Sequence, residues 1–483
     1  MRTRLILKNM MAASAGQLLS MLMSFIARAV FVRTLSIEYL GIGGLFGNVL
    51  AILSLTEMGM GTAVLFSLYA PITSGDTENI KSIIRMFRNA YRIIGCVSFC
   101  LGALLTPLIP YFSKETIEIP YLTVIYLLFV FQSSISYFLT YKQVLIVACE
   151  ERYIVDIYHN LFKIVQMVLT VILLVITHNY LVYLIALIMI GIIENLAIQR
   201  KADRMFPYLR DRRVIPLKRD EKREIKRGTL ALSVHKGSTV VVKGTDSLLL
   251  SKLVGMTAVG IYANYSMISS AVQGMMTALF ASMAASIGNI GVVEERQKQE
   301  NLFEILTLFE FWIVSFCSVC LLCLWNPFIR LWVGEQYLFD DWTVLTLSLL
   351  LYVSGRRQVV LMYRDALGLY QYDYIKAIAE AIVNLVVSII LAQRYGTLGV
   401  FLGTILSSIL ICLPIEANIV YKQGFHQKSG KFYLKYIIEF IFFTFMMLIT
   451  WKLTRLVPQN NILSFGAKMV ICVVIPNLLL WLG

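Results

Sequence analysis

Charged residues are scarce in this sequence, and their scarcity excludes an ordinary soluble fold. Aspartate, glutamate, lysine and arginine together make up 15% of the 483 residues, whereas about a quarter of a typical soluble domain is charged. Hydrophobic residues make up 58% of the chain. Many of them lie in apolar runs of about 20 residues, the length that a helix needs to cross a bilayer. The composition therefore predicts an integral membrane protein.

The motifs of common enzyme classes are also missing. The sequence contains no Gly-Lys-Ser/Thr phosphate-binding loop, no paired-histidine metal motif and no nucleophile elbow. Its eight cysteines lie mostly inside apolar runs, where small polarisable side chains commonly serve as packing residues. We therefore predict that the protein is not an enzyme and uses no catalytic residue, metal or cofactor.

The apolar runs predict an all-α polytopic membrane protein with about fourteen transmembrane helices. They group into a six-helix lobe (1–199), a basic linker (200–228), a second six-helix lobe (229–421) and two C-terminal helices (422–483). The predicted spans cover residues 10–32, 40–69, 83–112, 120–147, 153–178, 180–199, 228–252, 259–288, 302–326, 340–367, 373–393, 397–420, 434–455 and 461–482.

Positive charge is concentrated in particular connectors. The net charge is +14, and the linker 200–228 alone carries twelve lysines and arginines against five acidic residues. Because cytoplasmic connectors are enriched in lysine and arginine, this bias places the linker and both chain termini in the cytoplasm. Because such a linker is attracted to anionic lipid headgroups, membrane topology explains the basic charge of the chain. We therefore predict no nucleic-acid partner.

A short internal repeat supports the division into two lobes. When the first half is shifted by 219 residues, Arg33 falls on Lys252, Phe46 on Tyr265, and the Gly-Ile pair at 41–42 on that at 260–261. Six spans precede the linker, so both lobes begin on the cytoplasmic side. The repeats are then parallel, related by an axis along the membrane normal, as in two-lobed transporters.

The span 228–252 carries an unusual row of ionisable groups. Lys236, Thr239, Lys243 and Asp246 are spaced three or four residues apart, so they share one helix face. Charged groups are costly in lipid, so this face must meet another helix or a watery cavity. Two lysines exceed one aspartate, which leaves a positive face suited to an anionic substrate. The alternative is a local Lys243–Asp246 ion pair without a binding role.

The first span of the first lobe shows a weaker version of the same pattern. Gln17 and Arg28 lie on its polar face, and the repeat relates Gln17 to Lys236 in span 228–252. Two such faces would enclose a cavity between the lobes. Arg28 and Asp246 differ by one position in the repeat register, so we predict that they pair as an outer gate. Asp246 is then also a candidate for binding a coupling proton.

Further intramembrane polar residues are candidates for the cavity wall. The candidate cations are Lys236, Lys243, Arg28 and Arg356, and the candidate polar residues are Gln17, Asn48, Glu57, Thr239, Asn264 and Gln273. Polar residues on helix faces also commonly hold helices together. Arg356, beside Arg357, could instead extend its side chain toward the headgroups. The sequence leaves both interpretations open.

Three stretches carry a resemblance to a known family. They are EYLGIGGLFGNVLAILSLTEMGMGTAVLFSLYAPI (38–72), HKGSTVVVKGTDSLLLSKLVGMTAVGIYANY (235–265) and DALGLYQYDYIKAIAEAIVNLVVSIILAQRYGTLGVFLGTILSS (365–408). Together they resemble the bacterial polysaccharide flippases, a group that includes O-antigen and capsule-repeat flippases. These belong to the multidrug/oligosaccharidyl-lipid/polysaccharide exporter superfamily. The resemblance covers nearly the whole chain.

The resemblance implies a substrate and a mechanism. The implied substrate is a lipid-linked oligosaccharide, commonly on undecaprenyl pyrophosphate, which is moved from the inner to the outer leaflet of the bacterial inner membrane by alternating access. A proton or sodium gradient would drive the transport, and the implied partners are glycosyltransferases and a polysaccharide polymerase of the surface polysaccharide or lipopolysaccharide pathway.

Three competing functions remain open at this point. A peptidoglycan-precursor flippase would use the same chemistry on a different glycan. A drug or cation exporter of the same superfamily would favour acidic cavity residues, for which Glu57 and Asp246 are the candidates, and the excess of cations argues against it. A glycan polymerase or ligase would need a large external loop, whereas the longest outer connector expected here spans about residues 325–341.

Overall fold

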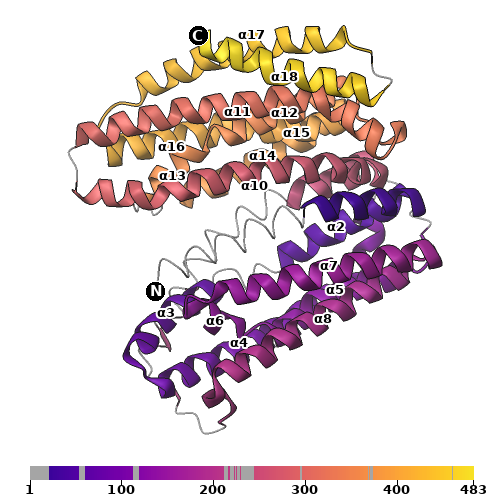
Figure 1. The fold of residues 1–483 in the computed structure, drawn as a ribbon, viewed down its shortest axis with the longest axis vertical. Helices are drawn as coiled ribbons and strands as arrows, with labels where there is room; N and C mark the ends of the chain where they lie inside the picture. The colour runs from indigo at the N-terminus through magenta and orange to yellow at the C-terminus, as the bar shows by residue number, and fades with distance from the viewer. Residues whose placement is uncertain are drawn as a thin grey trace. The chain divides into compact units, whose positions relative to one another are not determined.

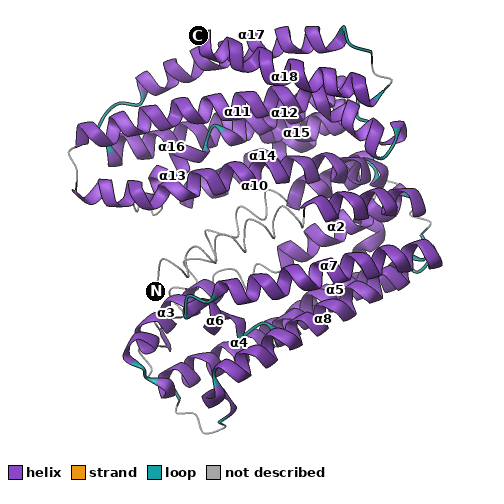
Figure 2. Cartoon of the chain, in the orientation of Figure 1, coloured by secondary structure: helices purple, strands orange, loops and turns teal. Residues whose placement is uncertain are grey.

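The described part of the chain is built of helices and contains no strand (Figure 2). In this computed structural model, contacts divide the chain into a first unit, Met1–Leu248, and a second unit, Leu249–Gly483. The structure describes residues 21–53, 60–112, 119–211, 244–293, 296–367, 374–458 and 461–482, together with residues 216–217, 222–223, 225, 229 and 369.

The first unit is a bundle of long helices joined by short turns (Figure 1). α4 packs along α5, α7 packs along α8, and α5 also contacts α8. A helix over residues 21–34 comes first. It is followed by α2 (Ile37–Leu53), α3 (Met60–Ser74), α4 (Thr77–Leu104), the short η2 (Thr106–Phe112), α5 (Leu122–Leu139), α6 (Gln143–Ala148), α7 (Arg152–Thr177), α8 (Tyr180–Met205) and the short η3 (Pro207–Arg210).

The second unit is also helical. α11 packs against α12, α17 and α18, while α14 packs along α15 and α12 also meets α15. Its elements are the π-turn η4 (Leu250–Val254), α10 (Met256–Val293), α11 (Arg296–Trp332), η5 (Glu335–Tyr337), α12 (Asp341–Gly355), α13 (Gln358–Ala366), α14 (Tyr374–Tyr395), α15 (Thr397–Ser407), η7 (Ser408–Cys412), α16 (Leu413–Ile419), η8 (Val420–Gly424), α17 (Gly430–Arg455) and α18 (Ile462–Leu482).

The helices have the length and surface of membrane spans. Nine helices of the described residues are long and apolar enough to cross a bilayer, or ten if the bent pair α4 and η2 forms one span. Large apolar side chains stay exposed along whole faces, as lipid contact requires. On α7 such a face consists of Ile157, Leu161, Val165, Val168, Ile172 and Ile176. The prediction of an all-α polytopic membrane protein is confirmed, and the count of about fourteen spans stays a prediction.

The predicted repeat is visible in where helices begin. α2 begins at Ile37 and α10 begins at Met256, which is the 219-residue offset expected from the sequence. Phe46 and Tyr265, which the same offset relates, are both fully buried. Phe46 lies edge-on to Tyr126, with ring centroids 5.0 Å apart. Equivalent positions in the two units therefore begin equivalent helices and bury equivalent aromatic rings.

Polar contacts attach the start of the basic linker to the first unit. Lys81 on α4 bonds Asp211 at 3.1 Å and Glu78 at 2.5 Å, and its side chain is 5% exposed. Lys142 bonds Asp203 near the end of α8 at 2.6 Å. Tyr208 packs against the apolar core between α3 and α4, and burial raises the pKa of this phenol to about 12. The start of the linker is therefore a packed structural segment.

Candidate functional site

The span formed by α12 and α13 is interrupted by two arginines. α12 ends at Gly355, α13 begins at Gln358, and Arg356 and Arg357 form the turn between them. Residues 341–365 together are apolar enough for a single membrane span. Two guanidinium groups in the interior of a span require partners, because an unpaired charge there is costly. Broken spans of this kind often form binding sites in transporters.

Arg356 is held by carboxylates from two other helices. Its Nη1 donates to Glu310 Oε2 on α11 at 3.0 Å and to the carbonyl oxygen of Thr307 at 2.8 Å. Its Nη2 donates to Glu439 Oε2 on α17 at 2.5 Å. The Arg356 side chain is only 2% exposed. We call Arg356, Glu310 and Glu439 the Arg356 group.

Glu310 also caps the second half of the broken span. Its Oε1 accepts a hydrogen bond of 2.7 Å from the backbone N–H of Val359, in the first turn of α13. A helix begins with unpaired N–H groups and a positive dipole end, both of which a carboxylate satisfies. Glu310 therefore ties α11 to both the arginine and the start of α13.

Arg357 belongs to a second group of buried charges. Its Nε and Nη2 donate to the two oxygens of Glu416 on α16 at 2.9 and 2.6 Å, a bidentate arrangement. Lys376 on α14 donates to the same carboxylate at 2.6 Å. Glu380 lies farther off, 3.7 Å from Arg357 and 3.8 Å from Lys376. We call Arg357, Lys376, Glu416 and Glu380 the Arg357 group.

The two groups connect helices that lie far apart in the sequence. Together they draw on α11, the α12–α13 turn, α14, α16 and α17. The rings of Phe311 and Tyr436 flank Arg356, with centroids 5.4 and 5.6 Å from its guanidinium carbon. This apolar surrounding strengthens each charge interaction and raises the cost of breaking one.

The structure places Arg356 differently from either sequence interpretation. The sequence proposed a cavity cation or a side chain extended toward the headgroups, whereas the buried guanidinium bonds two acids inside its own unit. A guanidinium so paired has less positive charge to offer a substrate phosphate. Its contact with substrate stays a prediction.

In the first unit, Arg28 lies among aromatic rings. It is partly buried and interacts electrostatically with Tyr180 and Tyr183 of α8. Phe31, one helical turn later, packs edge-on against both tyrosines at 5.9 and 5.4 Å. The predicted pairing of Arg28 with Asp246 across a gate stays a prediction.

Asn48 and Asp246 lie in the same neighbourhood of the first unit. The side-chain amide of Asn48 on α2 donates to the Ser247 hydroxyl at 2.8 Å, across 199 residues of sequence. Asp246, the preceding residue, is 7% exposed. The structure thus brings one predicted cavity residue next to the predicted gate residue.

The remaining predicted site residues fall into two sets. On α10, Asn264 is fully buried, and neither atom of its amide has a hydrogen-bond partner among the described residues, while Gln273 is partly buried. The others lie outside the described residues, and they are Gln17, Glu57, Lys236, Thr239 and Lys243.

Sequence reasoning missed the acids that pair with the two arginines. It treated Glu57 and Asp246 as the acidic candidates, yet the second unit buries the carboxylates of Glu310, Glu416 and Glu439 and partly buries that of Glu380. A signal existed, because Glu310 and Glu439 each interrupt a long apolar run. Charges inside membrane spans are usually paired, so adjacent arginines in one span predict acids in its neighbours.

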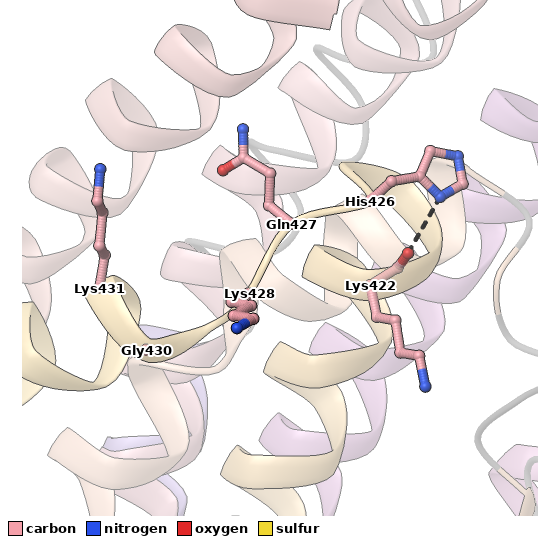
Figure 3. Close-up of a pocket in the computed structure, with 6 residues that line it drawn as sticks. All are labelled: Lys422, His426, Gln427, Lys428, Gly430 and Lys431. Carbon is pink, nitrogen blue, oxygen red and sulfur yellow. Dashed lines mark hydrogen bonds between the residues drawn. The ribbon is translucent and has the colours of Figure 1, made fainter.

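A basic hollow lies beside the turn between η8 and α17. Its volume is about 660 Å³, and Figure 3 shows the side chains that line it. The His426 ring nitrogen Nδ1 lies 3.2 Å from the carbonyl oxygen of Lys422. The lining residues are Lys422, His426, Gln427, Lys428, Gly430 and Lys431. These lysines belong to a connector that the charge bias predicts to be cytoplasmic, and this location stays a prediction.

The described side chains offer no arrangement for a metal ion. Among them, no group of three or more histidine, cysteine, aspartate or glutamate residues could hold one. The buried acids of the second unit instead meet arginine and lysine. Their arrangement supports ion pairing.

Comparison with known structures identifies the fold. The structure is similar to that of a lipid II flippase MurJ in an inward closed conformation, with a TM-score of 0.69 and 16% identity over 98% of this chain and 97% of that chain. It is also similar to an inward-facing multidrug resistance MATE family transporter of the MOP superfamily, with a TM-score of 0.61 and 15% identity over 85% and 96% of the two chains.

A further match is the Vibrio cholerae MATE transporter VcmN in its bent form, with a TM-score of 0.54 and 16% identity over 88% of this chain and 99% of that chain. At these identities the likeness concerns the fold. No curated protein matches the chain at the sequence level. The profile of the polysaccharide biosynthesis protein family matches residues 6–286. More than half of the chain is thus covered, and the chain belongs to the polysaccharide biosynthesis protein family, with the fold of MOP-superfamily transporters.

Proposed function

We propose that this chain is a flippase for a lipid-linked oligosaccharide. It moves the substrate, carried on undecaprenyl pyrophosphate, from the inner to the outer leaflet of the bacterial cytoplasmic membrane for surface polysaccharide synthesis, including O-antigen and lipopolysaccharide. The family match over residues 6–286 is the observation that carries this proposal. The fold shared with a lipid II flippase supports it.

The substrate poses a physical problem that cations solve. A pyrophosphate-linked glycan must take a charged, hydrated head through about 30 Å of hydrocarbon. Lys236, Lys243 and Arg28 are the cations that we assign to this head, since basic side chains replace its lost hydration. The prenyl tail can remain in lipid. A few dispersed cations suit a transporter because the substrate must also leave.

Transport proceeds by alternating access and is driven by an ion gradient in this proposal. Arg28 and Asp246 are the candidate gate, and both chain termini lie in the cytoplasm. Glycosyltransferases that build the oligosaccharide and a polymerase that consumes it are the functional partners. The protein itself makes and breaks no covalent bond.

A peptidoglycan-precursor flippase is the second candidate. The structural similarity to a lipid II flippase over nearly the full length of both chains favours it. The two candidates differ in the glycan and share the pyrophosphate carrier. A transport assay in which the two lipid-linked substrates compete distinguishes the two candidate functions, because the preferred substrate inhibits transport of the other. A drug exporter is disfavoured, because the charged row of span 228–252 carries two lysines against one aspartate.

The experiment that tests this proposal follows the lipid-linked oligosaccharide in cells. When the chain is depleted, the intermediate should accumulate on the cytoplasmic face, where an impermeant glycan-modifying reagent does not reach it in spheroplasts. Lys243→Ala should lower surface glycan about tenfold or more, since losing a charged hydrogen bond costs about 1.5–3 kcal/mol. Lys243→Arg should be milder.

The control is the amount of each variant in the membrane, which should equal that of the wild-type chain. If depletion leaves surface polysaccharide and its precursor unchanged while halting cell-wall synthesis, the second candidate replaces the first. If Lys236→Ala and Lys243→Ala export normally, singly and together, the substrate path lies elsewhere.

A further inference from the structure

The charges of the Arg356 group do not balance. Its single guanidinium contacts two carboxylates, those of Glu310 at 3.0 Å and Glu439 at 2.5 Å. The Arg357 group balances by contrast, because two cations face two acids. If every side chain of the Arg356 group were ionised, a net negative charge would be buried within the span. Buried carboxyl groups avoid that state by binding a proton.

The hydrogen bonds indicate which carboxyl carries the proton. Both oxygens of Glu310 accept hydrogen bonds, one from Arg356 and one from the N–H of Val359, so this carboxylate is satisfied as an anion. Glu439 uses only Oε2, and its buried Oε1 has no hydrogen-bond partner among the described residues. The unused oxygen is where a proton fits.

More buried polar atoms around the guanidinium lack partners. The Tyr352 hydroxyl, the Tyr436 hydroxyl and Arg356 Nε make no hydrogen bond to the described residues. All three side chains are at least nine-tenths buried. Buried polar groups are nearly always bonded, so this concentration of polar atoms around Arg356 marks a polar site among the helices.

The charged and titratable groups that face Glu439 come from several helices. On α17 itself, Lys435 and Tyr436 precede Glu439 by about one helical turn and interact with it electrostatically, whereas Lys468 of α18 lies near Cys323 and Cys472. From the other helices, the facing groups are Glu310 of α11, Tyr352 of α12 and Arg356 of the α12–α13 turn, whereas Arg357 faces Tyr436. Arg356 is the cation in direct contact.

We propose that Glu439 is a proton-exchange site that couples proton movement to transport; the coupling rests on the proposed function. With Glu439 protonated, the Arg356–Glu310 pair is neutral overall and α17 packs closely on the broken span. Loss of the proton to water leaves a carboxylate with excess negative charge, which favours a conformation that admits water. Glu439 lies about 14 Å along α17 from Gly430, at about 1.5 Å per residue, so exchange requires such an opening.

The proton balance of the step is simple. The carboxylate of Glu439 accepts one proton from water on one side of the membrane and becomes a neutral carboxylic acid. It returns one proton to water in the alternate conformation. No electron moves, and Arg356 and Glu310 keep their charges throughout. To couple proton movement to transport, the contact between α17 and the broken span needs at least two conformations that differ in the protonation of Glu439.

Infrared difference spectroscopy of the purified full-length chain in nanodiscs tests the site. Spectra recorded across a pH titration should show the carbonyl stretch of a protonated carboxyl that disappears at alkaline pH. Glu439→Gln should remove this band, and Glu439→Asp should keep it with a shifted midpoint. Glu380→Gln is the matched control from the Arg357 group and should leave the band unchanged.

One further variant sharpens the assignment. Among the described residues, Glu310→Gln leaves Glu439 as the only acid bonded to Arg356, so the band should then titrate at lower pH. A band that survives Glu439→Gln in a folded protein overturns the proposal, as does the absence of a titrating band from the wild-type protein. The spectra need no transported substrate, so they succeed or fail independently of the proposed function. In vesicles, Glu439→Gln should also make transport insensitive to an imposed pH gradient.

Discussion

The acidic residues of the second unit differ in how deeply they are buried and in how many hydrogen bonds their carboxylates accept. Glu416 is fully buried and accepts three hydrogen bonds from Arg357 and Lys376. Glu380 of the same group is more exposed and lies 3.7 Å from its closer partner. Removing one partner of a buried ion pair leaves an uncompensated charge, which costs about 3–5 kcal/mol. The stability of the unit should therefore depend on particular acids and not on their number.

We predict that Glu416→Gln lowers the free energy of unfolding by about 3–5 kcal/mol, because Arg357 and Lys376 then lose their shared anion. Glu380→Gln should cost about 1 kcal/mol or less, as expected of a partly exposed pair. Glu439→Gln should also cost little, since glutamine resembles the protonated acid. Thermal unfolding of the purified variants in one detergent measures all three. Equal losses for Glu416→Gln and Glu380→Gln would contradict this account.

The sequence drew attention to the two arginines, with Arg356 as a candidate cavity cation, but it did not predict the acids that pair with them. Arg356 and Arg357 are conspicuous because they lie in an apolar run. Their acids are 46, 59 and 83 residues away in the chain. Periodicity shows which residues share a helix face, but it does not show how far each helix is rotated toward its neighbours. That rotation depends on packing between all the helices, so the pairing had to come from the structure.

At the scale of elements, two helices of the second unit approach closely through glycines. α14 and α15 are joined at Gly396, whose φ of +58° is a conformation that other residues rarely adopt. A Cβ atom on Gly399 would lie 2.2 Å from the carbonyl oxygen of Leu391, and one on Gly403 would lie 2.1 Å from the Ser388 hydroxyl. Small residues at such positions allow membrane helices to pack backbone to backbone.

We predict that Gly403→Ala destabilises the protein by about 1–3 kcal/mol, the usual cost of overpacking a close contact. Gly466→Ala on α18 is the matched control, since a Cβ there would have nothing within 4 Å. Alanine favours a helix over glycine by up to about 1 kcal/mol, so the control should be neutral or more stable. The melting temperatures of the two variants give the comparison. A control that loses as much as Gly403→Ala would rule out the packing explanation.

The sequence predicted most spans to within a few residues and missed the breaks inside them. The span expected at 153–178 is α7, Arg152–Thr177, and that expected at 461–482 is α18, Ile462–Leu482. Hydropathy reveals a span because a helix in lipid must satisfy its own backbone. It does not reveal the turn at Arg356 and Arg357, because polar side chains and neighbouring helices stabilise such a break. The break is where the buried charges gather.

At the scale of the whole molecule, the chain consists of two helical units and belongs to the polysaccharide biosynthesis protein family. Each unit begins a helix at the position that the internal repeat predicts, Ile37 in one and Met256 in the other. The family match and the transporter fold are the two observations on which the proposed transport function rests. We propose that Lys236, Lys243 and Arg28 contact the substrate and that Glu439 exchanges the proton.

The central claim is that this chain alone carries a pyrophosphate-linked oligosaccharide across a bilayer. The measurement is a leaflet assay in vesicles that contain the purified chain and an undecaprenyl-pyrophosphate oligosaccharide with a fluorescent label on its sugar. The vesicles carry a pH gradient, with the interior either more acidic or more alkaline than the outside, and this gradient drives exchange of the substrate between leaflets. An impermeant quencher outside the vesicles should then extinguish nearly all of the fluorescence. Vesicles without the chain should lose only the outer-leaflet share. If vesicles containing the folded chain also lose only that share under either gradient, the account is contradicted.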